Sequence, residues 1–223
     1  MGNGCWNRPA LAGVDTKIER VGTTWDEVRR ALGSRPSVPV TPALAARAAV
    51  AIILRDGSAG IELLFIRRAE HPQDPWSGQM AFPGGRAEAA DADLRDTAVR
   101  ETAEEIGLDL VRAAEALGVL DEVRAMARLR PMDLTILPFV FRLEAPADLR
   151  LSSEVTSVHW LPLAALLGAE LRSTMDYVHD GTSLRFPCVR VDDLVIWGLT
   201  YRMLLALGEA LPGKAAAHAA DER

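Results

Sequence analysis

The sequence predicts an α/β fold in which helices cover a mixed β-sheet, and two observations favour it. Short apolar, partly β-branched runs are interleaved irregularly with helical patterns, unlike the regular alternation of a doubly wound parallel sheet. The chain has 223 residues, of which 49% are hydrophobic and 25% charged, as is usual for a soluble globular protein. A chain of this length can bury one sizeable core, so we expect one main domain with extensions.

The first predicted element is a short helix in an N-terminal extension, residues 1–44. Thr24 and Glu27 have the spacing of a capping box, in which each side chain accepts from the backbone amide of the other residue. Apolar residues then follow at helical spacing up to Gly33. We expect the main domain to comprise residues 45–211.

Two strands joined by a turn are predicted at the start of the main domain. The runs Ala48–Leu54 and Ile61–Ile66 are apolar, and residues 56–58 between them are typical of a turn. Residues 68–79 contain prolines, a glycine and polar side chains, so we expect a loop there.

The longest predicted helix lies between residues 93 and 106, where good helix formers run without glycine or proline before Gly107. Further elements are expected beyond it: strands at Ala116–Val123, Leu134–Leu143 and Val155–Trp160, and an apolar helix at Leu194–Leu211. Pro138 implies an edge position or a bulge in the second of these strands. Residues 212–223 are expected to form a disordered tail.

Charge and cysteine content narrow the class of protein. The net charge of −6 and the pI of about 5.3 argue against a nucleic-acid binder, because no overall positive field would attract phosphates. Cys5 and Cys188 lie far apart and fit no metal-ligand spacing, so we expect free thiols in a reducing compartment. Residues 1–10 lack the features of a signal peptide, and no apolar run approaches the roughly 18 residues of a membrane span. We expect a cytoplasmic protein.

Three glutamates of the long helix are the strongest functional signal. Glu101, Glu104 and Glu105 stand at positions i, i+3 and i+4, which places them on one helical face. The residues on the other side are suited to packing, so the acids are expected to point outward: Val99, Thr102, Ala103 and Ile106. Crowded carboxylates suit a hard cation such as Mg²⁺ or Mn²⁺. On spacing alone, the alternative is a solvated acidic face.

A glycine pair precedes this helix and adds a second signal. Pro83, Gly84 and Gly85 can bring backbone amide and carbonyl groups close to a metal ion or a phosphate, because glycine has no side chain. Glu154, in a polar turn, is a secondary candidate, and a plain surface glutamate is the equal alternative.

Together these segments resemble the Nudix box, G-x5-E-x7-R-E-U-x-E-E-x-G-U, in which U is a bulky aliphatic residue. Seven positions match it: Gly85, Arg100, Glu101, Glu104, Glu105, Gly107 and Leu108. Asp91 replaces the first glutamate, with eight residues instead of seven before the arginine, and Thr102 replaces the first U.

This resemblance implies a Nudix-type α/β/α sandwich that uses Mg²⁺ or Mn²⁺ to hydrolyse the diphosphate linkage of a small nucleotide-like substrate. It implies Glu101 and Glu105 as principal metal ligands, with the Gly85 carbonyl as a further ligand. Glu104 would support the metal or act as base, and Arg100 would orient it by an ion pair. Which carboxylate is the base stays open.

The chain also resembles a Nudix subgroup that splits coenzyme A and carries LLTxR[SA]x3Rx3Gx3FPGG before the box. Leu63, Leu64 and Arg67 match the start of that pattern, and Gly78 with residues 82–85 matches its end. The stretch Ile196-Trp197-Gly198-Leu199-Thr200 is similar too, so the resemblance covers about residues 45–210.

The middle of the subgroup pattern is missing. Arg67 and Gly78 lie two residues too far apart, and no arginine stands where the second one is expected. If that arginine helps to hold the 3′-phosphate of coenzyme A, then Arg67, Arg68 or His71 must replace it, or the substrate differs. Besides Arg67 and Arg68, the candidate substrate-binding residues are Gly84, Gly85 and Glu154.

Tryptophans and histidines give weaker signals. Trp76 and Trp160 are candidates for stacking on a purine, although tryptophan is more often a packing residue. Three histidines have no partner at ligand spacing and are interpreted as structural: His159, His179 and His218.

The leading function is hydrolysis of coenzyme A or its thioesters to a phosphopantetheine product and adenosine 3′,5′-bisphosphate. The enzymatic alternative is a Nudix hydrolase of ADP-ribose, a dinucleotide or a nucleoside triphosphate. A third is a non-catalytic nucleotide-binding regulator, against which the crowding of three acids argues. The expected partner is a small-molecule diphosphate, with neither nucleic acid nor membrane, and a homodimer is left open.

Overall fold

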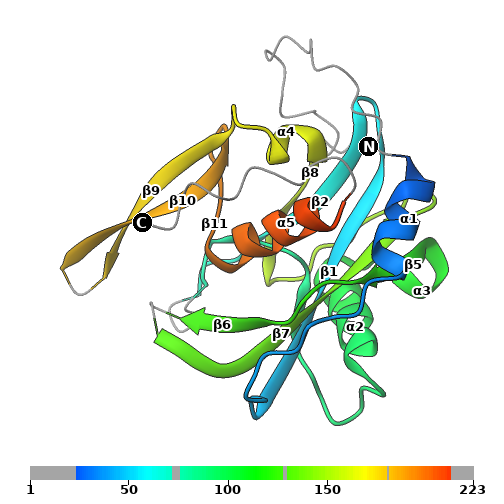
Figure 1. Cartoon of the computed structure of the whole chain (residues 1–223), viewed down its shortest axis with the longest axis horizontal. Coiled ribbons are helices and arrows are strands. Elements are labelled where there is room, and N and C mark those ends of the chain that lie inside the picture. Colours follow the sequence, from blue (N-terminus) through cyan, green and yellow to red (C-terminus); the bar gives the residue numbers. More distant parts are fainter. Residues whose placement is uncertain (1–23, 72–75, 128–129, 180, 212–223) are drawn as a thin grey trace.

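The computed structural model describes residues 24–71, 76–127, 130–179 and 181–211 (Figure 1). Cys5, His218 and the tail expected at 212–223 lie outside these residues. Within the described part of the chain, no helix has the length and apolarity needed to cross a membrane.

The main element is a mixed sheet of eight strands with the path β3-β2-β1-β7-β5, to which β4, β6 and β8 are added. Its strands are β1 Ala46–Gly57, β2 Gly60–Arg68, β3 Met80–Ala81, β4 Gly84–Arg86, β5 Ala114–Val119, β6 Val123–Ala127, β7 Arg130–Leu143 and β8 Val155–Pro162. Strands β1 and β7 pair in parallel, whereas the other pairs are antiparallel. The predicted mixed α/β fold is confirmed.

Both faces of this sheet are covered, which makes three layers. Alternate residues of β1 belong to two separate core clusters, because side chains of a strand alternate between its faces. Helices α1 (Trp25–Gly33), α4 (Leu163–Leu167) and α5 (Gly198–Ala210) contribute to one cluster. Helices α2 (Leu94–Ile106) and α3 (Leu110–Ala113) contribute to the other.

The predicted N-terminal helix is confirmed as α1. The capping box forms as expected, with the Thr24 hydroxyl accepting from the Glu27 amide and the Glu27 carboxylate accepting from the Thr24 amide. Val28 and Leu32 are fully buried in the core shared with the sheet. The N-terminal extension thus supplies part of the main core.

A second, three-stranded sheet was missed by the sequence analysis. It has the order β11-β10-β9, with β9 Arg172–His179, β10 Thr182–Val191 and β11 Leu194–Trp197. The prediction of one helix over 194–211 is therefore wrong at its start, because residues 194–197 pair with β10 and only then does α5 begin. Figure 1 shows β9 and β10 as a hairpin extending from the body of the molecule.

Pro138 was predicted to mark an edge position or a bulge; the edge alternative is wrong, whereas the pairing of β7 with β5 and β6 is irregular. Strand β7 is central, with β1 on one side and β5 and β6 on the other. The Pro138 carbonyl accepts from the Leu120 amide, and Leu120 lies between β5 and β6. Since the N and C=O of one residue face the same side of a strand, the missing N–H of Pro138 faces this interruption.

Candidate active site

Helix α2 carries the three glutamates, and both of its ends are capped. The Asp93 carboxylate accepts from the Asp96 amide at the N-terminus. Gly107 closes the C-terminus in the left-handed conformation with φ 68°, and its amide donates to the Ala103 carbonyl. The predicted helix is confirmed, so the glutamates share one short stretch of its surface.

The acids do not all point outward, which corrects the sequence-based expectation. Glu105 is 3% exposed and the Glu101 side chain 17%, whereas the Glu104 side chain is 59% exposed. Ala103, expected on the packing side, is exposed. The difference arises because α2 packs across β1 and β4, which cover the face carrying Glu101 and Glu105.

Strand β4 approaches α2 through two glycines. The Gly84 amide donates to Glu105 Oε2 at 2.9 Å. A Cβ atom on Gly85 would lie 2.4 Å from Glu101 Oε1, so only glycine leaves room for this carboxylate. Gly84 has φ 150°, and a Cβ there would meet the Ala49 carbonyl oxygen at 2.3 Å. The glycine pair therefore sets how closely the sheet approaches both carboxylates.

Arg100 ties the acidic residues together. Its guanidinium donates to Asp91 at 2.9 and 3.2 Å, to Glu101 at 3.1 Å, to Glu104 at 3.0 Å and to the Arg86 carbonyl at 3.0 Å. The ion pair expected between Arg100 and Glu104 is present. These charge-assisted bonds hold the arginine in one orientation over the helix.

Asp91, a departure from the family pattern, is the residue that holds this arginine. Its carboxylate also accepts from the Thr97 hydroxyl at 2.8 Å and from the Glu88 amide at 2.9 Å. The hydrogen bonds from Arg100, first of all, keep the pKa of Asp91 far below its usual range. Asp91 thus anchors Arg100 as a permanently charged partner.

Burial raises the pKa of both inner glutamates. The pKa of Glu105 rises to about 7, chiefly through burial, although the Gly84 amide and Arg68 oppose the shift. Burial likewise raises the pKa of Glu101, against the opposing charge and hydrogen bond of Arg100. Glu154 adds to both shifts by its negative charge, so it lies close enough to act on these carboxylates. Such crowding favours a bound cation.

The carboxylates fit a divalent metal ion chemically. Within the described residues, no three acidic, histidine or cysteine side chains are already gathered around one point. Mg²⁺ does not require such a cage, since it binds through one or two carboxylates, waters and substrate phosphates. Glu101 and Glu105 offer those oxygens, and the absence of a Cβ on Gly85 leaves room for the Glu101 carboxylate beside β4.

Arg67 and Arg68 lie beside this cluster, at the end of β2. Arg68 Nη1 is 3.9 Å from Glu105 Oε1. Both arginines line a pocket of about 670 Å³ together with Glu70, Gly78 and Thr156. Arg67 Nη2 donates to Asp193 Oδ2 at 3.0 Å and to the Asp193 carbonyl at 3.2 Å, so an acidic residue of the second sheet already engages it.

The aromatic candidates lie elsewhere. The ring of Trp160 is covered by the Arg55 guanidinium, 4.0 Å from its centroid, so the suggested stacking on a purine is not supported at this residue. Trp76 donates from Nε1 to the Met126 carbonyl and packs against the core, as a structural tryptophan does. His159 is half-buried and bonded to the Ser157 hydroxyl, consistent with a structural role. The side chain of His179 lies outside the described residues.

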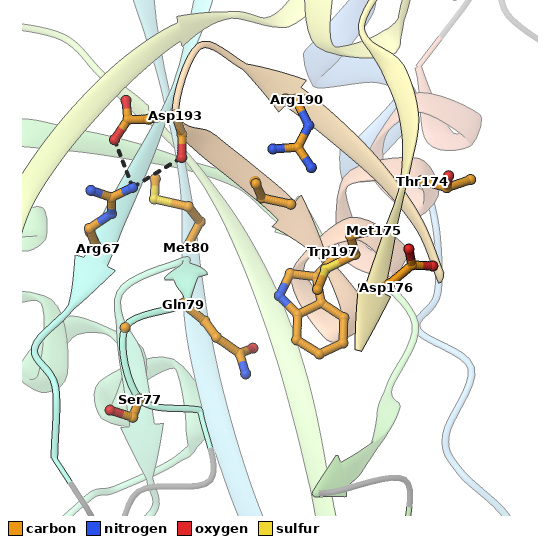
Figure 2. Close-up of a pocket in the computed structure, with 12 residues that line it drawn as sticks. Arg67, Ser77, Gln79, Met80, Thr174, Met175, Asp176, Arg190, Asp193 and Trp197 are labelled. Atoms are coloured by element: carbon orange, nitrogen blue, oxygen red, sulfur yellow. Dashed lines mark hydrogen bonds and ion pairs between the residues drawn. The ribbon is translucent and has the colours of Figure 1, made fainter. Parts of the chain in front are cut away.

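A second pocket lies between the main sheet and the three-stranded sheet (Figure 2), and we call it the Trp197 pocket. Its volume is about 490 Å³. The residues that line it are Arg67, Ser77, Gly78, Gln79, Met80, Thr174, Met175, Asp176, Arg190, Asp193, Val195 and Trp197. Most of them were not predicted from the sequence, because the strands that carry them were not recognised. The signals were Arg67 and Gly78 of the subgroup pattern and the resemblance of residues 196–200.

Comparisons with known proteins agree with the box and the fold. A family model described as NUDIX domain matches residues 45–180, more than half of the chain. A Schizosaccharomyces pombe protein designated C14C4.10c is 42% identical over 114 residues, 50% of this chain and 35% of that protein. The Nudix hydrolase NudL of Salmonella paratyphi B is 32% identical over 146 residues, 65% of this chain and 72% of that protein.

The chain therefore spans about a third of the yeast relative and nearly three quarters of the bacterial one. Among solved structures, a MutT/nudix family protein from Enterococcus faecalis is 19% identical, with a TM-score of 0.48. That comparison covers 72% of this chain and 60% of the other.

Proposed function

This chain belongs to the Nudix family of pyrophosphohydrolases, and we propose that it hydrolyses the diphosphate linkage of coenzyme A or its thioesters. The products would be adenosine 3′,5′-bisphosphate and a phosphopantetheine compound. Nudix hydrolases generally use divalent metal ions, and we propose Mg²⁺ or Mn²⁺ here.

The observation that best supports diphosphate hydrolysis is the position of Glu101 and Glu105. Both face strand β4, where Gly84 and Gly85 have no side chains, and both are at least partly shielded from solvent. Two carboxylates in such a place destabilise the fold unless a cation joins them. A structural acidic face would instead leave all three glutamates in water. Buried Glu105 beside partly buried Glu101 therefore favours a functional site over a solvated face.

We assign the roles from these contacts. Glu101 and Glu105 would hold the metal ion, with Glu104, Glu154 and the Gly85 carbonyl as further oxygen ligands. When bound, the ion would neutralise charge that develops on the diphosphate. Arg100 holds Glu101 and Glu104 in position.

In the reaction, the oxygen of a water molecule forms a bond to one phosphorus of the linkage. The bond from that phosphorus to the bridging oxygen breaks, and the second phosphate leaves with the electron pair. A carboxylate of the cluster accepts the proton of the water. The Glu104 side chain is exposed and can be reached by water, so we propose Glu104 as the first base to test.

An extended substrate suits the two neighbouring pockets. Arg67 and Gly78 line both of them, and Arg68 connects the first to Glu105. The segment 196–200, similar to the coenzyme A subgroup, lies next to this path, and the Thr200 hydroxyl donates to the Met80 carbonyl at 3.0 Å. These shared lining residues are the reason for proposing a substrate that extends across both pockets.

A substrate panel tests the proposal. Coenzyme A, dephospho-coenzyme A, ADP-ribose and a nucleoside triphosphate are incubated with Mg²⁺ or Mn²⁺ in ¹⁸O-labelled water, and products are identified by mass. We expect cleavage of coenzyme A, with the label in one product marking the attacked phosphorus. Cleavage of ADP-ribose or the triphosphate without cleavage of coenzyme A would overturn the substrate proposal and leave the family assignment standing.

A further inference from the structure

One face of the three-stranded sheet supplies four of the residues that line the Trp197 pocket, and Thr174 and Asp176, from the other face of β9, line it too. The pairing of β9, β10 and β11 places Met175, Arg190, Val195 and Trp197 on the same side, because alternate residues of paired strands share a face. The other face of β10 and β11 carries buried apolar residues that pack into the core: Val189, Val191, Leu194 and Ile196. Arg190 lies on the opposite face from these residues, so its side chain takes no part in the core.

The charges around the pocket leave one cation uncompensated. Asp176 is paired with Arg185 at 3.0 Å, and Asp193 is paired with Arg67 at 3.0 Å. Arg190 is exposed at the pocket wall, and its side chain has no acidic partner among the described residues. Figure 2 shows Arg190 above Trp197, on the side of the pocket across from Arg67 and Asp193. The pocket thus offers a guanidinium available for an anion.

The wall beside Arg190 is aromatic and apolar. Trp197 lines the pocket and is supported by Tyr177 and Phe186, whose ring centroids lie 5.2 and 5.8 Å from it. Met175 and Met80 add flexible apolar surface. An indole ring next to a guanidinium suits a ligand that combines a flat base with a phosphate.

The pocket is also tied to the catalytic cluster. The turn between β10 and β11 places Asp192 in the left-handed region with φ 51°, and the next residue, Asp193, bonds Arg67 of β2. Arg67 and Gly78 also line the neighbouring pocket, together with Arg68, whose Nη1 lies 3.9 Å from Glu105 Oε1. A ligand in the Trp197 pocket can therefore extend past Arg67 toward Arg68.

We propose that the Trp197 pocket is a nucleotide subsite in which Arg190 binds a phosphate monoester and Trp197 packs against the adjoining base. Resting on the proposed function, this phosphate is the 3′-phosphate of coenzyme A. Arg190 then takes the place of the arginine missing from the subgroup pattern, since Arg67 already engages Asp193. Arginine suits this task because its planar fork donates two hydrogen bonds to one phosphate.

Binding without metal tests the subsite apart from catalysis. Adenosine 3′,5′-bisphosphate and adenosine 5′-monophosphate are titrated by calorimetry into the full chain in EDTA. The wild type is expected to prefer the bisphosphate about ten- to hundredfold, and Arg190→Gln to lose that preference. Arg202→Gln, which removes an exposed charge from α5 outside the pocket, is the matched control and should keep it. Equal binding of both nucleotides by the wild type, or an unchanged preference in Arg190→Gln, overturns the subsite.

Kinetics separate the two proposals. In Arg190→Gln, kcat/KM for coenzyme A should fall about ten- to hundredfold and kcat/KM for dephospho-coenzyme A should not change. An equal fall for both substrates counts against a 3′-phosphate contact. If the wild type binds the bisphosphate through Arg190 but cleaves no coenzyme A, the subsite stands and the substrate assignment fails. If coenzyme A is cleaved with no preference over dephospho-coenzyme A, the subsite proposal fails and the substrate assignment stands.

Discussion

Glu105→Gln removes a charge from a carboxylate that is 3% exposed and accepts a hydrogen bond from the Gly84 amide at 2.9 Å. The amide oxygen of glutamine can accept the same bond, and the side-chain volume hardly changes. The variant should therefore keep the fold and lose the metal-dependent activity. In the absence of metal it should be more stable than the wild type at alkaline pH.

The size of this gain follows from the pKa of Glu105. Burial raises it to about 7 in the folded protein from an ordinary 4.5. Between these values the folded protein keeps a proton that the unfolded chain has released, so the free energy of unfolding falls as pH rises. A rise of the pKa from 4.5 to about 7 corresponds to about 3 kcal/mol at pH 8. For a chain of this size that is a melting-temperature difference of about 6–12 °C.

Thermal melts in EDTA at several pH values measure the effect. Glu105→Gln should melt above the wild type at pH 8, and the two curves should converge as pH falls toward 4.5. Glu104→Gln is the matched control for stability, since its side chain is 59% exposed on the same helix and should shift the melt little. Saturating Mg²⁺ should then raise the wild-type melting temperature, and raise that of Glu105→Gln much less.

An unchanged or lower melting temperature of Glu105→Gln at pH 8 would refute the reasoning, because burial of the charge would then cost nothing. A pH-independent difference would show that the gain comes from packing instead of ionisation. Full activity of the variant at saturating Mg²⁺ would remove Glu105 from the metal site.

Three further predictions follow from other contacts. Gly85→Ala should lower kcat at least tenfold with a nearly unchanged melt, because its Cβ would displace the Glu101 carboxylate, and a normal kcat would contradict the close approach. Asp91→Asn should lower kcat more than it raises KM, since it weakens the orientation of Arg100. Steady-state kinetics measures both constants, and a change in KM alone would contradict this role of Asp91. Leu32→Ala should cost about 2–4 kcal/mol in urea unfolding, because Leu32 is buried, and a loss below about 1 kcal/mol would show that α1 is not part of the core.

The sequence by itself determined the features that depend on local spacing. The capping box at Thr24, the helix ending at Gly107 and the placement of the glutamates on that helix follow from interactions within a few residues. The strands β1 and β2 were also recognisable, because both are apolar runs separated by a turn. The family assignment rests on the same local pattern and was confirmed.

Tertiary structure decided which parts of these elements are covered. Nothing in the helical pattern distinguishes buried Glu105 from exposed Glu104, because the difference depends on where β4 crosses α2. The eight-residue spacing before Arg100 departs from the family pattern, and only the folded chain brings Asp91 onto that guanidinium.

The pockets depend on contacts between residues far apart in the chain. Arg67 meets Asp193 across 126 positions, and Met80 meets Thr200 across 120. The strands that bring Arg190 and Trp197 to the pocket pair with one another, and without that pairing residues 194–197 resemble the start of the apolar helix that follows them. Local propensity cannot choose between strand and helix in such a run, because pairing with a distant partner supplies the deciding energy.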